Sequence, residues 1–173
     1  MNENIPTEEA VLQVRKECRQ FAMLYFHFCK TLVEQFGEEN AKPLVIRALL
    51  SLSRQRVDGI RKKADQLGLA YTPESFNEVN DLPNIGWVKE LGREHCPYAV
   101  CWRQYFDAYP WFRSFAPLYC NVIDTNNIEY FTGNLSHRLT KNVLTGDDTC
   151  ERIYFESPAV HDGKYTYTEP LAD

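Results

Sequence analysis

The chain has 173 residues, of which 44% are hydrophobic and 13% aromatic, and its formal net charge is -5. This length fits a single domain, expected to span 1–173, and the composition excludes a disordered chain. The negative charge gives no global attraction to nucleic acid or to an anionic membrane. The N-terminus lacks the basic and apolar regions of a signal peptide, and no run of about 20 apolar residues could cross a bilayer. We therefore predict a cytoplasmic protein with free thiols, no nucleic-acid partner and no membrane partner.

The first part of the chain, 1–70, is expected to be helical. Apolar residues recur at three- and four-residue steps from 7 to 36, which predicts one long helix that ends at Gly37. A second helix is predicted from 40 to 67, with Pro43 in its first turn. One face of this second helix is basic, and it suits either solvent or an acidic partner protein. Its basic residues are Arg47, Arg54, Arg56, Arg61, Lys62 and Lys63.

The second part, 71–173, is expected to mix strands and helices. Four strands are predicted, at 76–79, 85–91, 138–144 and 150–156. A helix is predicted to begin at Pro97 and to end before Pro110, and 124–130 is expected to form a helix or an ordered loop. The sequence thus predicts an α+β fold, in which two long N-terminal helices pack with a C-terminal antiparallel sheet that is interrupted by shorter helices. This second part is expected to carry the functional site.

Cysteines and charged residues concentrate between 96 and 150. Cys96 precedes the helix predicted at Pro97, where exposed amides would stabilise a thiolate, so Cys96 is a candidate nucleophile or else an inert capping residue. Cys120 and Asp124 are four residues apart and would share one face of a helix, where a thiol and a carboxylate could exchange a proton or hold a polar ligand. Asp124 could equally be a cap, and Cys150 a buried thiol of the sheet.

A metal site is the alternative use of these groups. Thiol and imidazole ligands from Cys96, Cys120, His137 and Cys150 would suit zinc. The spacing is wide, however, and contains no close ligand pair such as CxxC, so the sequence predicts no metal. The glycine-rich and metal-binding motifs GxGxxG, GxxxxGK[ST] and HExxH are also missing from the sequence, and we expect no cofactor.

The same stretch resembles the L-2-amino-thiazoline-4-carboxylic acid hydrolase family. The resemblance covers roughly 35–156 and rests on three motifs, which are Cys96-Pro-Tyr-Ala, Leu118-Tyr-Cys with Asp124 following, and Arg138-Leu-Thr followed by Gly146-Asp-Asp-Thr-Cys. The sequence departs from the family where the last motif usually continues with an acidic and an aromatic residue, because Glu151-Arg-Ile follows here.

The resemblance implies ring-opening hydrolysis of a carbon–nitrogen bond in a small cyclic amidine, a thiazoline carboxylate. It implies catalytic roles for Cys96, Asp124 and Cys120, and substrate binding by Arg138, His137 and Cys150. Adjacent strand residues point to opposite faces, so only one of His137 and Arg138 is expected to face the pocket. The alternatives are a non-catalytic small-molecule-binding or sensory module that uses the same pocket, and an interaction protein that uses the basic helix. The aromatic stretch 105–119 could line a pocket, pack in the core or form a homo-oligomer face.

Overall fold

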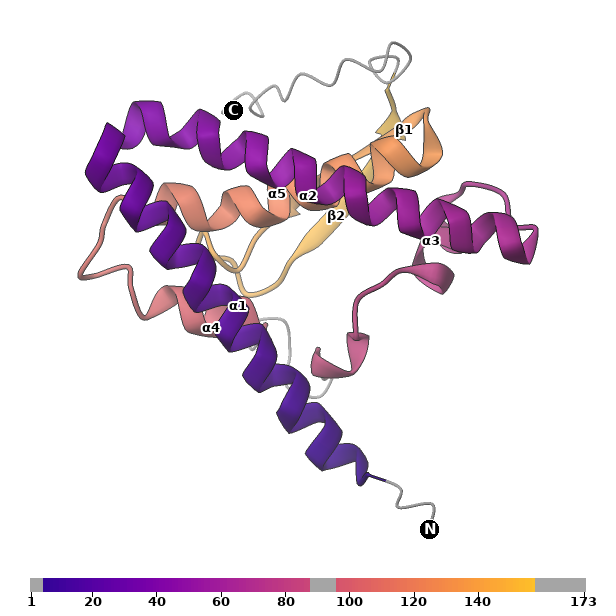
Figure 1. Cartoon of the computed structure of the whole chain (residues 1–173), viewed down its shortest axis with the longest axis horizontal. Helices are drawn as coiled ribbons and strands as arrows, with labels where there is room; N and C mark the ends of the chain where they lie inside the picture. The colour runs from indigo at the N-terminus through magenta and orange to yellow at the C-terminus, as the bar shows by residue number, and fades with distance from the viewer. Residues whose placement is uncertain (1–4, 88–95, 158–173) are drawn as a thin grey trace. The chain divides into compact units, whose positions relative to one another are not determined.

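The computed structural model describes residues 5–87 and 96–157 (Figure 1). Within these ranges the chain forms five α-helices, one 3₁₀ helix and two strands, so the predicted α+β class is confirmed. In chain order they are α1 (Thr7–Phe36), α2 (Glu38–Leu67), α3 (Pro73–Val79), η1 (Asn84–Gly86), α4 (Pro97–Arg103), α5 (Phe112–Thr132), β1 (Leu135–Lys141) and β2 (Glu151–Glu156).

The long helices α1 and α2 confirm the periodicity seen in the sequence. α1 has the predicted limits, and α2 begins two residues earlier than predicted. Gly37 and Gly68 end the two helices with positive φ angles of 75° and 66°, a conformation that glycine adopts without strain. No helix in the described ranges is long and apolar enough to cross a membrane.

The chain divides into two compact units, each built from three separate segments. The first unit comprises Met1–Lys42, Leu82–Pro117 and Thr140–Glu151. The second unit comprises Pro43–Asp81, Leu118–Leu139 and Arg152–Asp173. The single-domain organisation of 1–173 stays a prediction, and each unit is described by itself below.

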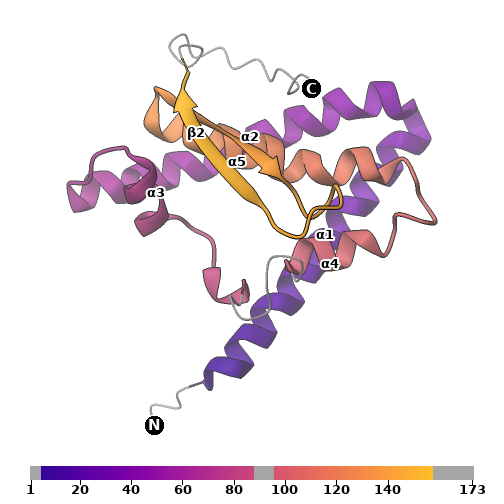
Figure 2. The same cartoon turned by 180° about the vertical axis from the view of Figure 1, so that it is seen from behind.

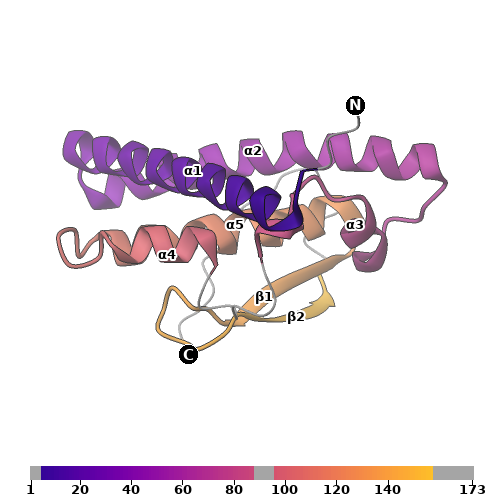
Figure 3. The same cartoon turned by 90° about the horizontal axis from the view of Figure 1, so that it is seen from below.

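In the first unit, α1 packs against α4 and η1, and α4 runs along α1 in Figures 1 and 3. Trp102 of α4 is fully buried, and its indole N–H donates to the carbonyl oxygen of Ala22 at 2.8 Å. The ring of Phe26 stacks on that of Tyr105, with 3.7 Å between the centroids. Phe106, Phe112 and Phe115 of the aromatic stretch are buried, so these three residues pack in the core of the first unit.

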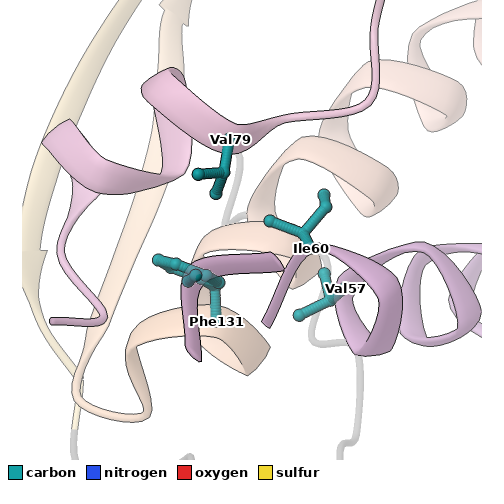
Figure 4. Packing of buried hydrophobic residues seen from close by; sticks show 5 residues of the cluster. Val57, Ile60, Val79 and Phe131 are labelled. Atoms are coloured by element: carbon teal, nitrogen blue, oxygen red, sulfur yellow. The ribbon is translucent and has the colours of Figure 1, made fainter. Parts of the chain in front are cut away.

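In the second unit, the core lies between α2, α3 and the end of α5. It consists of five buried side chains, which are Val57, Ile60, Ala64, Val79 and Phe131. All of them except Ala64 are labelled in Figure 4. Beside this core, the hydroxyl of Ser53 donates to Oδ1 of Asn127 at 2.7 Å, and both residues are buried. α2 and α5 are thus joined by an apolar cluster and by a buried hydrogen bond.

The two strands pair side by side and run in opposite directions, as Figure 2 shows. The loop between them is closed by the carboxylate of Asp147, which accepts from the backbone N–H of Asn142 at 2.7 Å. The two strands are therefore joined by a hairpin loop, and β1 both begins and ends three residues earlier than predicted. The sheet lies on one side of α5 (Figure 3).

The strand predicted at 76–79 is wrong, because these residues belong to α3. The side chain of Thr72 caps α3 by accepting from the N–H of Ser75, whose hydroxyl in turn accepts from the N–H of Thr72. Pro73 occupies the first turn, where its missing N–H costs nothing. These capping residues stabilise a helix in spite of the β-forming residues Phe76 and Val79.

The strand predicted at 85–91 is also wrong for its first residues. Asn84–Gly86 form the 3₁₀ helix η1, and Trp87 follows as its C-terminal cap. The guanidinium of Arg15 donates to the carbonyl oxygen of Gly86 at 2.9 Å, which fixes η1 on α1. The remainder of that predicted strand, 88–91, lies outside the described residues.

Candidate functional site

An ion pair between α5 and β2 is the centre of the candidate site. Nη2 of Arg152 donates to Oδ2 of Asp124 at 2.6 Å, and the two side chains are 33% and 27% exposed. Asp124 lies in α5, and Arg152 is the second residue of β2. Both groups belong to the second unit. A half-buried, charge-assisted pair of this kind fixes the orientation of the carboxylate while leaving it within reach of solvent.

His137 of β1 adjoins this ion pair. Its side chain is buried, and its ring meets that of Tyr154 edge-on, with 5.7 Å between the centroids. Burial lowers the pKa of His137, and the charge of Arg152 lowers it further, whereas the charge of Asp124 raises it. The net shift is downward, so the imidazole is neutral at pH 7. We refer to Asp124, His137 and Arg152 as the acid–base cluster.

Two hydrogen bonds attach β1 to α5 and so position His137. The hydroxyl of Thr125 donates to the carbonyl oxygen of His137 at 3.0 Å. The hydroxyl of Ser136 donates to the carboxylate of Glu129, and both residues are buried. Nδ1 of His137 is buried and has no hydrogen-bond partner within the described part of the chain. Buried polar atoms without a partner are rare in folded proteins, and a catalytic role is one explanation for such an atom.

A second ion pair in the same unit joins α2 to the segment after α3. Nε and Nη2 of Arg56 donate to the carboxylate of Asp81 at 3.0 and 2.6 Å. Burial lowers the pKa of Arg56, but the hydrogen bond and charge of Asp81, with smaller effects of Tyr119 and Asp124, raise it overall. Asp81 is thus the main partner that keeps the half-buried guanidinium of Arg56 charged.

Several of the residues predicted for the site lie in this unit. Cys120 is one helical turn before Asp124 on α5 and is half-buried. Arg138 follows His137 on β1, but its side chain is exposed. His137 is therefore the inward-facing member of this pair.

The other two predicted cysteines belong to the first unit. Cys96 caps the N-terminus of α4 with its backbone, whose carbonyl oxygen accepts from the N–H of Val100 at 2.9 Å, and its side chain makes no capping hydrogen bond. Cys150 lies in the hairpin loop, where its Sγ accepts from the N–H of Val143 at 3.5 Å. Their roles in catalysis and substrate binding stay predictions. Among the described residues, no group of three or more His, Cys, Asp or Glu side chains is arranged to hold a metal ion.

Comparison with known proteins assigns the chain to a family. The family model described as L-2-amino-thiazoline-4-carboxylic acid hydrolase matches residues 17–154. The chain belongs to this family. The match includes the acid–base cluster, the Arg56–Asp81 pair and all six cysteines. No curated protein and no solved structure matches the chain.

The sequence alone did not indicate three of the four residues that form the Asp124–Arg152 and Arg56–Asp81 ion pairs. Arg56 is one of several cations on the second predicted helix, Asp81 lies outside every predicted element, and Arg152 appears only in the departure from the usual family motif. The departure is a signal in one respect, because an arginine in a predicted strand can form an ion pair with a carboxylate on a neighbouring element. Asp124 is that partner.

Proposed function

We propose that the protein hydrolyses a small cyclic amidine that carries a carboxylate, with L-2-amino-thiazoline-4-carboxylate as its reference substrate. Family membership supports the reaction class. One observation supports the proposed location of the reaction, which is the ion pair of Asp124 and Arg152 beside the buried His137. Groups whose pKa is shifted by burial and by a specific charge partner mark functional sites.

In the proposed reaction, water adds to C2 of the ring, and the neutral imidazole of His137 accepts a proton from that water. The tetrahedral carbon then collapses, the bond between C2 and the ring nitrogen breaks, and the nitrogen receives the proton. The product retains the C2–S bond and carries a new primary amine. A depressed pKa suits this role, because a histidine that stays neutral at pH 7 can act as the base.

Asp124 is proposed to hold the amidine by its N–H groups, so that positive charge on the ring is stabilised while water attacks C2. Arg152 is a positioning residue in this scheme, since its guanidinium fixes the orientation of the Asp124 carboxylate. Cys120 lies one turn away on the same helix and could donate a hydrogen bond to the bound ring. Arg138 remains the candidate from sequence for the substrate carboxylate.

Cys96 offers a second route, in which its thiolate attacks C2 and water later releases the adduct. Intact-protein mass spectrometry during turnover distinguishes the two routes. An adduct that disappears in Cys96→Ala supports the covalent route, whereas turnover by Cys96→Ala supports direct attack by water. Cys150, which is engaged by the hairpin loop, is expected to tolerate Cys150→Ser with little loss of rate.

The test is the hydrolysis of L-2-amino-thiazoline-4-carboxylate by purified protein, measured with and without a chelator. Asp124→Asn and His137→Gln should each lower kcat by about 10²-fold or more, the scale of a lost general base or electrostatic group. Lys141→Gln is the matched control for Arg152→Gln, because it also removes the cation of an ion pair in the sheet, here the exposed pair of Lys141 and Glu151.

The chemical identity of the product shows which bond of the ring breaks. A new primary amine supports cleavage of the C–N bond, whereas a new thiol would contradict it and would indicate cleavage of the C–S bond. If the wild-type protein binds the compound and does not consume it, hydrolysis is overturned, and the protein is a binding or sensory module.

A further inference from the structure

A hollow of about 400 Å³ lies between α2 and the end of α3, within the second unit. Its volume is in the range of small-molecule sites. Three charged residues line it, which are Arg56 and Lys63 from α2 and Asp81 from the segment after α3. We refer to it as the α2–α3 hollow. It is built by residues that the family resemblance did not single out.

The charges of the α2–α3 hollow favour an anion. Two cations and one carboxylate give its lining a formal charge of +1. Arg56 uses Nε and Nη2 for Asp81, which leaves Nη1 for a further acceptor. Lys63 makes no ion pair with any residue that the structure describes. One negative charge on a ligand would therefore balance the lining, with the half-buried Arg56 and the exposed Lys63 as partners.

The apolar part of the lining favours a compact ring or hydrocarbon body. Leu52, Ile60 and Val79 line the hollow, and Ile60 and Val79 also belong to the buried core in Figure 4. Their placement is therefore fixed by packing. Gln55 and Asn80 add amide groups to the lining. A few polar groups on an apolar wall are typical of small-molecule sites.

Gly59 gives a separate reason to regard the hollow as a site. It lies inside α2, where glycine is unfavourable relative to alanine. A Cβ added at Gly59 would meet no atom within 4 Å, so close packing does not require a glycine at this position. The missing side chain leaves space in the hollow that a long side chain, such as that of leucine, would fill.

We infer that the α2–α3 hollow binds a small monocarboxylate with a compact ring, whose carboxylate pairs with Lys63 and Arg56. Its ring lies against Ile60 and Val79, and Gly59 leaves room for it. A thiazoline carboxylate has this chemistry, but none of Asp124, His137 and Arg152 lines the hollow, so the hollow is a second site for such a ligand and not the site of the proposed reaction.

Binding is tested with 2-aminothiazole-4-carboxylate, whose aromatic ring resists ring opening, so that no turnover is needed. Isothermal titration calorimetry should detect binding, and both 2-aminothiazole and acetate should bind at least 10-fold more weakly, because one lacks the carboxylate and the other the ring. Lys63→Met and Gly59→Leu should each weaken binding at least 10-fold. Lys62→Met and Gly59→Ala are the matched controls, one removing a neighbouring charge of α2 and the other adding one methyl group.

The outcomes separate this inference from the proposed function. If the wild type binds the probe and Lys63→Met and Gly59→Leu do not, the inferred binding site is supported. If the wild type also fails to turn over the thiazoline, the proposed hydrolase function is overturned. Turnover of the thiazoline, together with binding of 2-aminothiazole-4-carboxylate that neither variant weakens, overturns the hollow and leaves the proposed function standing. No heat of binding, or binding that both variants leave unchanged, overturns the inference itself. Circular dichroism should show that the Gly59→Leu variant retains its helices.

Discussion

The guanidinium of Arg152 and the carboxylate of Asp124 lie 2.6 Å apart, which joins β2 to α5 at the residue that the sequence marks as a candidate acid. The pair is half-buried, so its charges interact more strongly than they would in bulk water and remain subject to screening by salt. The neighbouring His137 experiences both charges with opposite effects on its pKa. Substitutions in this cluster should therefore have predictable and separable effects.

We expect Asp124→Asn to abolish most of the hydrolytic activity and to change the free energy of unfolding by no more than about 1 kcal/mol. A half-exposed ion pair contributes little to stability, whereas a carboxylate that holds the reacting group contributes to the rate. Urea unfolding and steady-state kinetics measure the two effects. Arg152→Gln should lower activity less, since Arg152 acts only through Asp124. Equal losses in rate would contradict the role of Arg152 as a positioning residue.

The imidazole of His137 should titrate differently in the two variants. Burial is the main cause of its lowered pKa, Arg152 adds to the lowering, and Asp124 opposes it. Arg152→Gln should therefore raise the pKa of His137, and Asp124→Asn should lower it further. NMR titration of the imidazole resonances measures both directions. Shifts in the same direction in both variants would show that the cluster is not arranged as described.

The same residue predicts how stability depends on pH. In the unfolded chain, histidine has a pKa of about 6.5, and the folded value of His137 is lower. Between these values the unfolded state binds a proton that the folded state does not, so the free energy of unfolding falls as the pH drops below about 6.5. It stops falling at the folded pKa. Urea unfolding at pH 7.5 and 5.5 measures this fall in the free energy of unfolding, which should be smaller for His137→Gln than for the wild type. His27→Gln, at an exposed position of α1, is the control and should show the same fall as the wild type.

Much of the helical structure could be predicted, because it depends on local periodicity. The stripes of α1 and α2 and the proline at the start of α4 are properties of neighbouring residues. Strand propensity was misleading at Phe76 and Val79, where capping by Thr72 and Ser75 stabilises α3. Capping bonds are local too, but their pattern here, Thr-Pro-Glu-Ser, uses a serine where glutamate or glutamine is usual.

The candidate site could be predicted only in part. Asp124 and His137 were found because their residue types are chemically distinctive. Arg56 and Asp81 are 25 residues apart, and Asp124 and Arg152 are 28 apart, and no local pattern indicates which of many arginines pairs with which carboxylate. Such pairing depends on the packing of α2, α5 and β2, and only the folded chain provides it.

A buried hydrogen bond between α2 and α5 should matter for stability and not for chemistry. The Ser53 hydroxyl donates to Oδ1 of Asn127 at 2.7 Å, and Ser53 has no exposed surface. Ser53→Ala leaves a buried acceptor without its donor, which costs about 1–3 kcal/mol. Ser51→Ala, at an exposed position of the same helix, is the matched control and should change stability by less than about 0.5 kcal/mol. Urea unfolding measures both, and equal effects would contradict the importance of the buried bond.

The packing of η1 on α1 depends on the absence of a side chain at Gly86. A Cβ at this position would lie 2.6 Å from Cγ1 of Val14, although the backbone itself would accept alanine. Val14 is β-branched and has few alternative rotamers, so it cannot easily move aside. Gly86→Ala should therefore lower the free energy of unfolding by about 1–3 kcal/mol, the usual cost of overpacking.

Val14→Ala removes the methyl group that Gly86→Ala would strike, so the double variant tests the cause of this loss. Adding Gly86→Ala to Val14→Ala should cost less than adding it to the wild type, and urea unfolding of the four proteins gives the coupling free energy directly. Gly59→Ala is the matched control, because its Cβ meets open space, and it should stabilise α2 by roughly 0.5–1 kcal/mol. A full and equal cost of Gly86→Ala in both backgrounds would show that the contact with Val14 is not what requires a glycine.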